Sequence, residues 1–104
     1  MARDGNEDKV RLLRLLAFHV HKKIPPAEAL ATCFEAEGRG GRHRQWRQGT
    51  QVLDADGFVP ALLATNLVGP EGGAVLAVVE SGGDHRLMSA ALTALAELAE
   101  QGER

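Results

Sequence analysis

The chain carries few side chains that could do chemistry, and its histidines are the first to test. His19 and His21 stand two residues apart in a predicted helix, where they point to different sides and cannot share a metal ion. His43 and His85 are isolated in the sequence. Because no Cys-x-x-Cys, His-x-x-x-His or Glu-x-x-His spacing occurs, we predict neither a metal site nor a bound cofactor.

The other candidate reactive groups are the single cysteine, Cys33, and several carboxylates near predicted turns. Phe34 follows Cys33 in a segment that must pack against a core, so a buried structural thiol is favoured over a nucleophile. A glycosidase-type pair could be drawn from the carboxylates, but helix capping explains most of them more simply. These carboxylates are Asp54, Asp56, Glu71, Glu80 and Asp84. We predict no catalytic residue and expect the protein not to be an enzyme.

An arginine-rich stretch surrounds the single tryptophan, Trp46. Its basic residues are Arg39, Arg42, His43, Arg44 and Arg47. Arginine binds phosphate and an aromatic ring stacks on a base, so a small helical protein that binds RNA or single-stranded DNA is one hypothesis. The formal net charge of −2 argues against nucleic acid and favours a solvated arginine face with Trp46 turned into the core.

The length and composition indicate one globular domain without a membrane span. The 104 residues are 44% hydrophobic and 25% charged, which is ordinary for a folded domain. The longest apolar run, 74–79, is far shorter than the roughly 20 residues of a membrane-spanning helix. We therefore expect a cytoplasmic chain that does not itself insert into a membrane. Residues 1–52 are basic and residues 53–104 acidic. This split suits partners or second copies of opposite charge, and two simply solvated faces are an equally favoured interpretation.

Apolar residues at three- and four-residue steps predict six helices. We expect them at about 10–22, 26–37, 42–53, 57–67, 74–81 and 85–101. The β-branched stretch 74–81 could also form a strand, but a lone strand among helices would leave its backbone groups without partners. Asp54 or Asp56 is expected to cap the fourth helix and Asp84 the sixth, while Gly49 weakens the third by about 1 kcal/mol.

The same periodicity predicts the core positions and the fold class. The inward residues are expected to be Leu12, Leu13, Leu16, Val20, Ile24, Ala27, Leu30, Ala31, Phe34, Trp46, Leu53, Phe58, Ala61, Leu62 and Leu63, with Met88, Ala91, Leu92, Leu95, Leu98 and Ala99 in the last helix. Ser89, Glu97 and Glu100 are expected outside this last stripe. The fold is predicted to be all-α, a compact antiparallel bundle of about six short helices over 10–101, with a disordered polar N-terminus at 1–9 and a tail at 102–104.

Several motifs in this order resemble a known family. Leu16-Ala17 is followed by Lys23-Ile24-Pro25 and Glu28-Ala29-Leu30, Phe58 precedes Ala61-Leu62, Glu80-Ser81 leads into Gly82-Gly83, and the last helix carries Met88, Leu92, Leu95-Ala96 and Glu100. The pattern resembles the type II secretion system protein F domain, the cytoplasmic domain of the inner-membrane platform protein of type II secretion and type IV pilus systems. The chain departs from it at Lys23 and Val79, where the family has glycine, and in a turn lengthened by about three residues at 84–87.

The resemblance implies a six-helix antiparallel bundle that works as a non-enzymatic docking scaffold at the inner face of the bacterial inner membrane. It implies protein partners in a secretion or pilus assembly, including its ATPase, and a second copy of the chain is a further candidate partner. Family domains lead into a membrane helix, so the chain is expected to be an excised domain or a soluble relative. Where the apolar stripe of the last helix exceeds what the bundle covers, the surplus is a candidate interface. The candidate interaction residues are Arg39, Arg42, Arg44, Arg47, Glu80, Asp84, Glu97 and Glu100.

Overall fold

The computed structural model describes residues 5–38 and 43–102, and over these ranges it contains six α-helices and no strand. The helices are α1 (Gly5–His21), α2 (Pro26–Gly38), α3 (His43–Asp56), α4 (Phe58–Ala64), α5 (Pro70–Gly82) and α6 (His85–Gly102). The prediction of an all-α bundle of six short helices is confirmed. The stretch 74–81 lies inside α5, so helix was the correct choice over strand.

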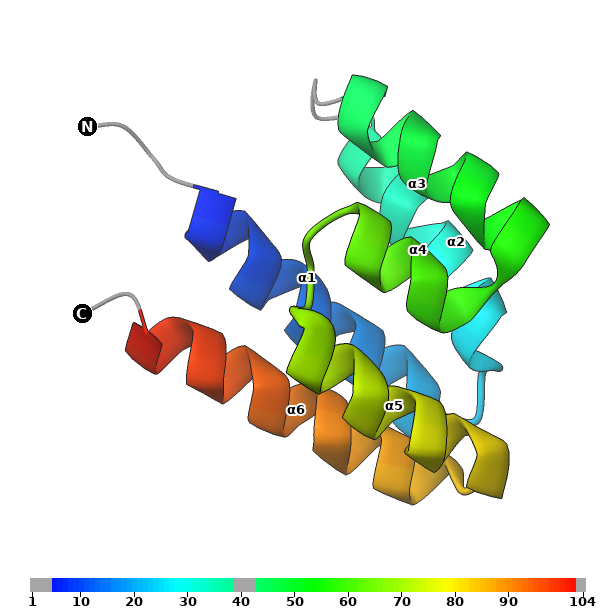
Figure 1. Cartoon of the computed structure of the whole chain (residues 1–104), viewed down its shortest axis with the longest axis vertical. Helices are drawn as coiled ribbons and strands as arrows, with labels where there is room; N and C mark the ends of the chain where they lie inside the picture. The colour runs from blue at the N-terminus through cyan, green and yellow to red at the C-terminus, as the bar shows by residue number, and fades with distance from the viewer. Residues whose placement is uncertain (1–4, 39–42, 103–104) are drawn as a thin grey trace.

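The helices form two groups that meet at the middle of the molecule (Figure 1). In one group, α6 packs along α1 and α5 packs on α6, while in the other α3 packs against both α2 and α4. The contacts of α1 with α2 and of α4 with α5 join the two groups. Because α1 and α6 run antiparallel, the first turn of α1 and the last turn of α6 lie at the same end of the molecule (Figure 1).

The buried core follows the predicted apolar stripes of α1, α2 and α6. Leu12, Leu13, Leu16 and Val20 of α1 are fully buried, as are Leu30 of α2 and Leu92 of α6. The two aromatic rings Phe34 and Trp46 stack at 5.6 Å between centroids and 25° between planes, and they join α2 to α3. Burial of these side chains is the main favourable contribution to the stability of the fold.

Four predicted core positions are wrong. Ala27 and Ala31 are exposed on α2, where Ala29 and Cys33 are buried instead, because the buried face is the one that carries Leu30 and Phe34. Leu63 and Leu98 are 40% and 61% exposed. The apolar stripes of α4 and α6 are wider than the faces that neighbouring helices cover.

Ser89 is buried, although its polarity predicted a position outside the stripe. Its hydroxyl donates a hydrogen bond of 3.0 Å to the backbone carbonyl of Ala17 on α1. A small side chain fits the close α1–α6 contact, and the bond satisfies the hydroxyl that would otherwise be costly to bury.

Three helix starts differ from the prediction. The helix α5 begins at Pro70 rather than at residue 74, because proline suits the first turn of a helix. Residues 5–9 belong to α1, which the sequence predicted to begin at about residue 10, and residues 1–4 lie outside the described ranges. Neither Asp54 nor Asp56 caps α4, because α3 continues through both and Gly57 takes the N-cap position without a side-chain hydrogen bond. A φ of 111° at this residue explains why glycine stands there.

The predicted cap of the last helix is confirmed. The Asp84 carboxylate accepts hydrogen bonds from the backbone N–H groups of Arg86 and Leu87, at 2.9 Å and 3.3 Å from Oδ1. Gly83 precedes it with a φ of 74°, a left-handed conformation that ends α5 and turns the chain back along α6.

Gly49 lies in the middle of α3 for a packing reason that the sequence does not reveal. A Cβ atom at this position would lie 2.5 Å from Cγ2 of Thr65 and 2.9 Å from Cζ of Phe34. The glycine therefore lets α3 approach α2 and the end of α4 closely, and this contact offsets its low helix propensity.

Within the described ranges, no helix is both long enough and apolar enough to cross a membrane.

Candidate interaction surface

The helix α5 is apolar around most of its circumference but is covered on one side only. Leu76 and Gly73 are its buried residues, and Val79 is partly buried against the core. Val75 and Val78 are 52% and 71% exposed. An ordinary surface helix keeps charged or polar residues on its outer face, so this helix presents an apolar side that the rest of the chain does not cover.

The helix α6 also carries an apolar stripe that is largely exposed. Leu87, Ala91, Ala94 and Leu98 follow one another at steps of four, three and four residues, which places them on one side of the helix. Leu87 and Leu98 are 54% and 61% exposed, while Ala91 is partly buried. This side lies next to the one that carries Leu95, whose side chain lies beside Gly72 of α5.

Two contacts fix how α5 and α6 lie against each other. A Cβ atom at Gly72 would lie 3.1 Å from Cδ2 of Leu95, and at the other end Val79 and Met88 line the same small hollow. The exposed valines of α5 and the exposed stripe of α6 therefore lie on two helices that pack against each other in antiparallel register. We call the combined surface the α5–α6 apolar face, and it consists of Val75, Val78, Leu87, Ala91, Ala94 and Leu98.

The charged residues of α5, α6 and their turn are almost all acidic. Residues 70–102 contain five carboxylates and one Lys or Arg residue, Arg86. The carboxylates are Glu71, Glu80, Asp84, Glu97 and Glu100, and all five residues are exposed. Glu100 forms an ion pair of 2.7 Å with Arg14 of α1. The predicted candidates Glu80, Asp84, Glu97 and Glu100 thus belong to the same helix pair as the apolar face.

Two of the four predicted basic candidates lie in the other group of helices. Arg39 and Arg42 fall outside the described residues, Arg44 lies in the first turn of α3 without a described side chain, and Arg47 is exposed on α3. Trp46 is only 3% exposed, and its indole Nε1 is buried without a hydrogen-bond partner among the described residues. The prediction that Trp46 turns into the core is confirmed, and its ring is not available to stack on a base.

The candidate reactive groups form no metal site in the described part of the chain. No group of three or more His, Cys, Asp or Glu residues there could hold a metal ion. Cys33 is fully buried, and desolvation by this burial, helped by the charge of Glu37, raises the pKa of its thiol to about 12. A thiol that stays protonated at neutral pH is a poor nucleophile.

Two hollows lie along the α1–α5–α6 group. The first, of about 120 Å³, sits at the turn between α5 and α6 and is lined by Pro26, Val79, Glu80, Gly83, Asp84, His85 and Met88. The second, of about 280 Å³, is a shallow depression between α1 and α6 lined by Arg14, Ala17, Phe18, His21, Ser89 and Thr93. Both are smaller than the usual 300–1,000 Å³ of a small-molecule site.

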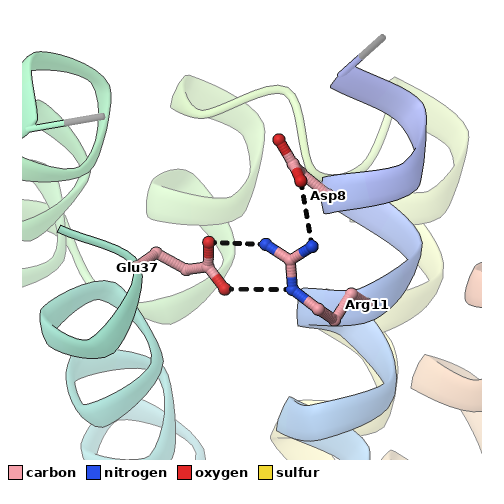
Figure 2. Close-up of polar contacts among 3 residues, drawn as sticks. All are labelled: Asp8, Arg11 and Glu37. Atoms are coloured by element: carbon pink, nitrogen blue, oxygen red, sulfur yellow. Dashed lines mark hydrogen bonds and ion pairs between the residues drawn. The ribbon is translucent and has the colours of Figure 1, made fainter. Parts of the chain in front are cut away.

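A cluster of three charged residues ties α1 to α2 (Figure 2). The Arg11 guanidinium donates from Nη2 and Nε to the two carboxylate oxygens of Glu37, at 2.8 Å and 3.4 Å, and from Nη1 to Asp8 at 3.0 Å. The hydrogen bond to Glu37 is the main cause that raises the pKa of Arg11 above its ordinary value. The two-oxygen geometry gives this cluster a structural role in orienting α2.

No protein-family model, curated protein or solved structure matches the chain.

Proposed function

We propose that the chain is a non-enzymatic interaction module that docks other components of a secretion or pilus assembly. The α5–α6 apolar face is the observation that carries this proposal. Val75, Val78, Leu87 and Leu98 are each more than half exposed on two adjoining helices. Contiguous apolar surface of this kind gains free energy when a partner removes it from water, at about 25 cal/mol per Å².

The backbone at Lys23 also supports the proposal. Its φ of 74° is left-handed, a conformation in which glycine is favoured, and glycine is the residue that the resembled family carries at this position. The glycine turn at 82–83, which the family resemblance also includes, sets α5 and α6 antiparallel and so creates the apolar face. The partners that the resemblance suggests are assembly components such as the ATPase, at the cytoplasmic side of the inner membrane.

The proposal is tested by changing the face in the source organism. In a strain whose chromosomal copy carries Val78→Glu, we expect loss of protein secretion or piliation and loss of partners from the isolated complex. Phe18→Glu is the matched control, because Phe18 is a similarly exposed apolar residue, 53% exposed, on α1. Secretion, piliation and complex composition that stay unchanged after deletion of the gene would refute the proposal.

A further inference from the structure

We infer that the α5–α6 apolar face binds an amphipathic helix of another protein, with Lys or Arg residues flanking its apolar stripe. This inference rests on the proposed function and deepens it, since it names the surface and the chemistry of the partner.

The shape of the face favours a helix as its occupant. Val75 and Val78 on α5 and Leu87 and Leu98 on α6 follow two antiparallel helices that touch at Gly72 and Leu95. Two helices packed side by side present ridges and grooves of side chains. A third helix can pack onto such a pair at an axis distance of about 8–10 Å. A partner helix would contact this surface with apolar residues at three- and four-residue steps.

The charged residues around the face indicate which charge the partner should carry. Glu71 stands four residues before Val75 on the same side of α5, and Glu97 directly precedes Leu98 on α6. Both are exposed, and α4, the neighbour of α5 in the other group, contains no charged residue. Arg14 of α1 is paired with Glu100. Arg86 directly precedes Leu87 on α6, so residues 70–102 set five carboxylates against one arginine. Complementary charge therefore means Lys or Arg beside the partner's apolar stripe.

The same charges argue against a second copy of this chain on the face. A two-fold dimer through the face would place α5 and α6 against their own equivalents, so the carboxylates of 70–102 would meet carboxylates. Within 70–102, Arg86 is the one Lys or Arg residue of each copy that could offset them. Like charges brought together at an interface suppress a pairing, so another protein is favoured as the occupant.

Site-specific photo-crosslinking in the source organism tests the inference. A photoreactive phenylalanine analogue is placed at position 78, at position 98 or, as the control, at position 18, and crosslinked segments are identified by mass spectrometry. We expect positions 78 and 98, but not 18, to capture one segment of another protein. That segment should carry apolar residues at helical spacing with Lys or Arg beside them.

A synthetic peptide of the captured segment then measures the contribution of charge. Relative to wild type, Glu71→Lys with Glu97→Lys should weaken peptide binding at low salt by about 10-fold or more, and Val78→Glu should weaken it by a similar factor. Phe18→Glu should leave binding within about two-fold, the scatter expected of a surface change away from the interface.

The possible outcomes separate this inference from the proposed function. Capture of a second copy of the chain at position 78, or of a segment with acidic flanks, would overturn the inference. Capture of assembly components from position 18 alone would overturn it while leaving the docking function intact. Absence of crosslinks to another protein from all three positions would count against both.

Discussion

At the scale of single residues, Gly49 shows that close packing can outweigh helix propensity. Gly49→Ala should raise helix propensity by about 1 kcal/mol, yet the added methyl group would collide with Thr65 and Phe34. We expect a net loss of about 1–3 kcal/mol in the free energy of unfolding, measured by urea denaturation.

A second glycine of the chain supplies the control for this change. Gly82 ends α5, and a Cβ atom there would meet nothing within 4 Å. Gly82→Ala should therefore be neutral or slightly stabilising. If Gly49→Ala and Gly82→Ala had the same unfolding free energy, the close approach of Thr65 and Phe34 to Gly49 would be contradicted.

Lys23 is the residue whose replacement should stabilise the protein. Its φ of 74° costs a residue with a Cβ atom about 1 kcal/mol, and glycine removes this cost. Lys23→Gly should raise the urea midpoint, whereas Lys23→Ala, which keeps the Cβ atom, should not. Equal midpoints for the two variants would contradict the left-handed turn after α1.

The Cys33 thiol should be unreactive in the folded protein. Burial raises the pKa of its thiol from the ordinary value of 9.0 to about 12, so a disulfide reagent at pH 8 should react only after unfolding in urea. Because the folded pKa is raised, stability from this group is complete below pH 9 and is lost as pH rises toward 12. Rapid reaction of the native thiol at pH 8 would disprove its burial.

At the scale of elements, the two predicted N-caps behave differently. Asp84 accepts two backbone hydrogen bonds at the start of α6, so Asp84→Ala should cost about 1 kcal/mol in unfolding free energy. Asp54 lies exposed inside α3, and Asp54→Ala should stay within about 0.5 kcal/mol of wild type. Thermal or urea unfolding that ranks the two variants in the opposite order would contradict the observed cap.

Most of the helices could be predicted from the sequence because they carry apolar residues at helical spacing, whereas 74–81 was assigned to a helix because a lone strand would lack partners. Their ends were harder, since the start of α4 depends on the left-handed backbone of Gly57 rather than on the nearby aspartates. Contacts between distant segments gave no local signal. The burial of Ser89 depends on the facing carbonyl of Ala17, and Arg11 meets Glu37 across 26 residues of sequence.

The candidate site was only partly predictable for the same reason. The width of the apolar stripe in α6 could be read from the sequence, but the part that remains exposed depends on where α1 and α5 lie. Leu98 was predicted to lie in the core but is mostly exposed, and Val78 of α5 is mostly exposed as well. The burial of Trp46, by contrast, agrees with the sequence argument from net charge.

At the scale of the whole molecule, the exposed apolar residues of α5 and α6 stand apart from the buried core. Buried residues from all six helices form one core, while the large apolar residues exposed on α5 and α6 lie outside it. Since Val78 and Leu98 are mostly exposed, changing them should affect partner binding without affecting the core. Stability and partner binding should therefore be separable at Val78 and Leu98.

The double variant Val78→Glu with Leu98→Glu tests this separation most directly. Its unfolding free energy and the proteins retained by the affinity-tagged chain in the source organism are measured together, with Phe18→Glu as the control. The account predicts an unfolding free energy within about 1 kcal/mol of wild type and loss of the retained partner. Retention of that partner by the double variant, or a loss of stability well above 1 kcal/mol, would contradict it.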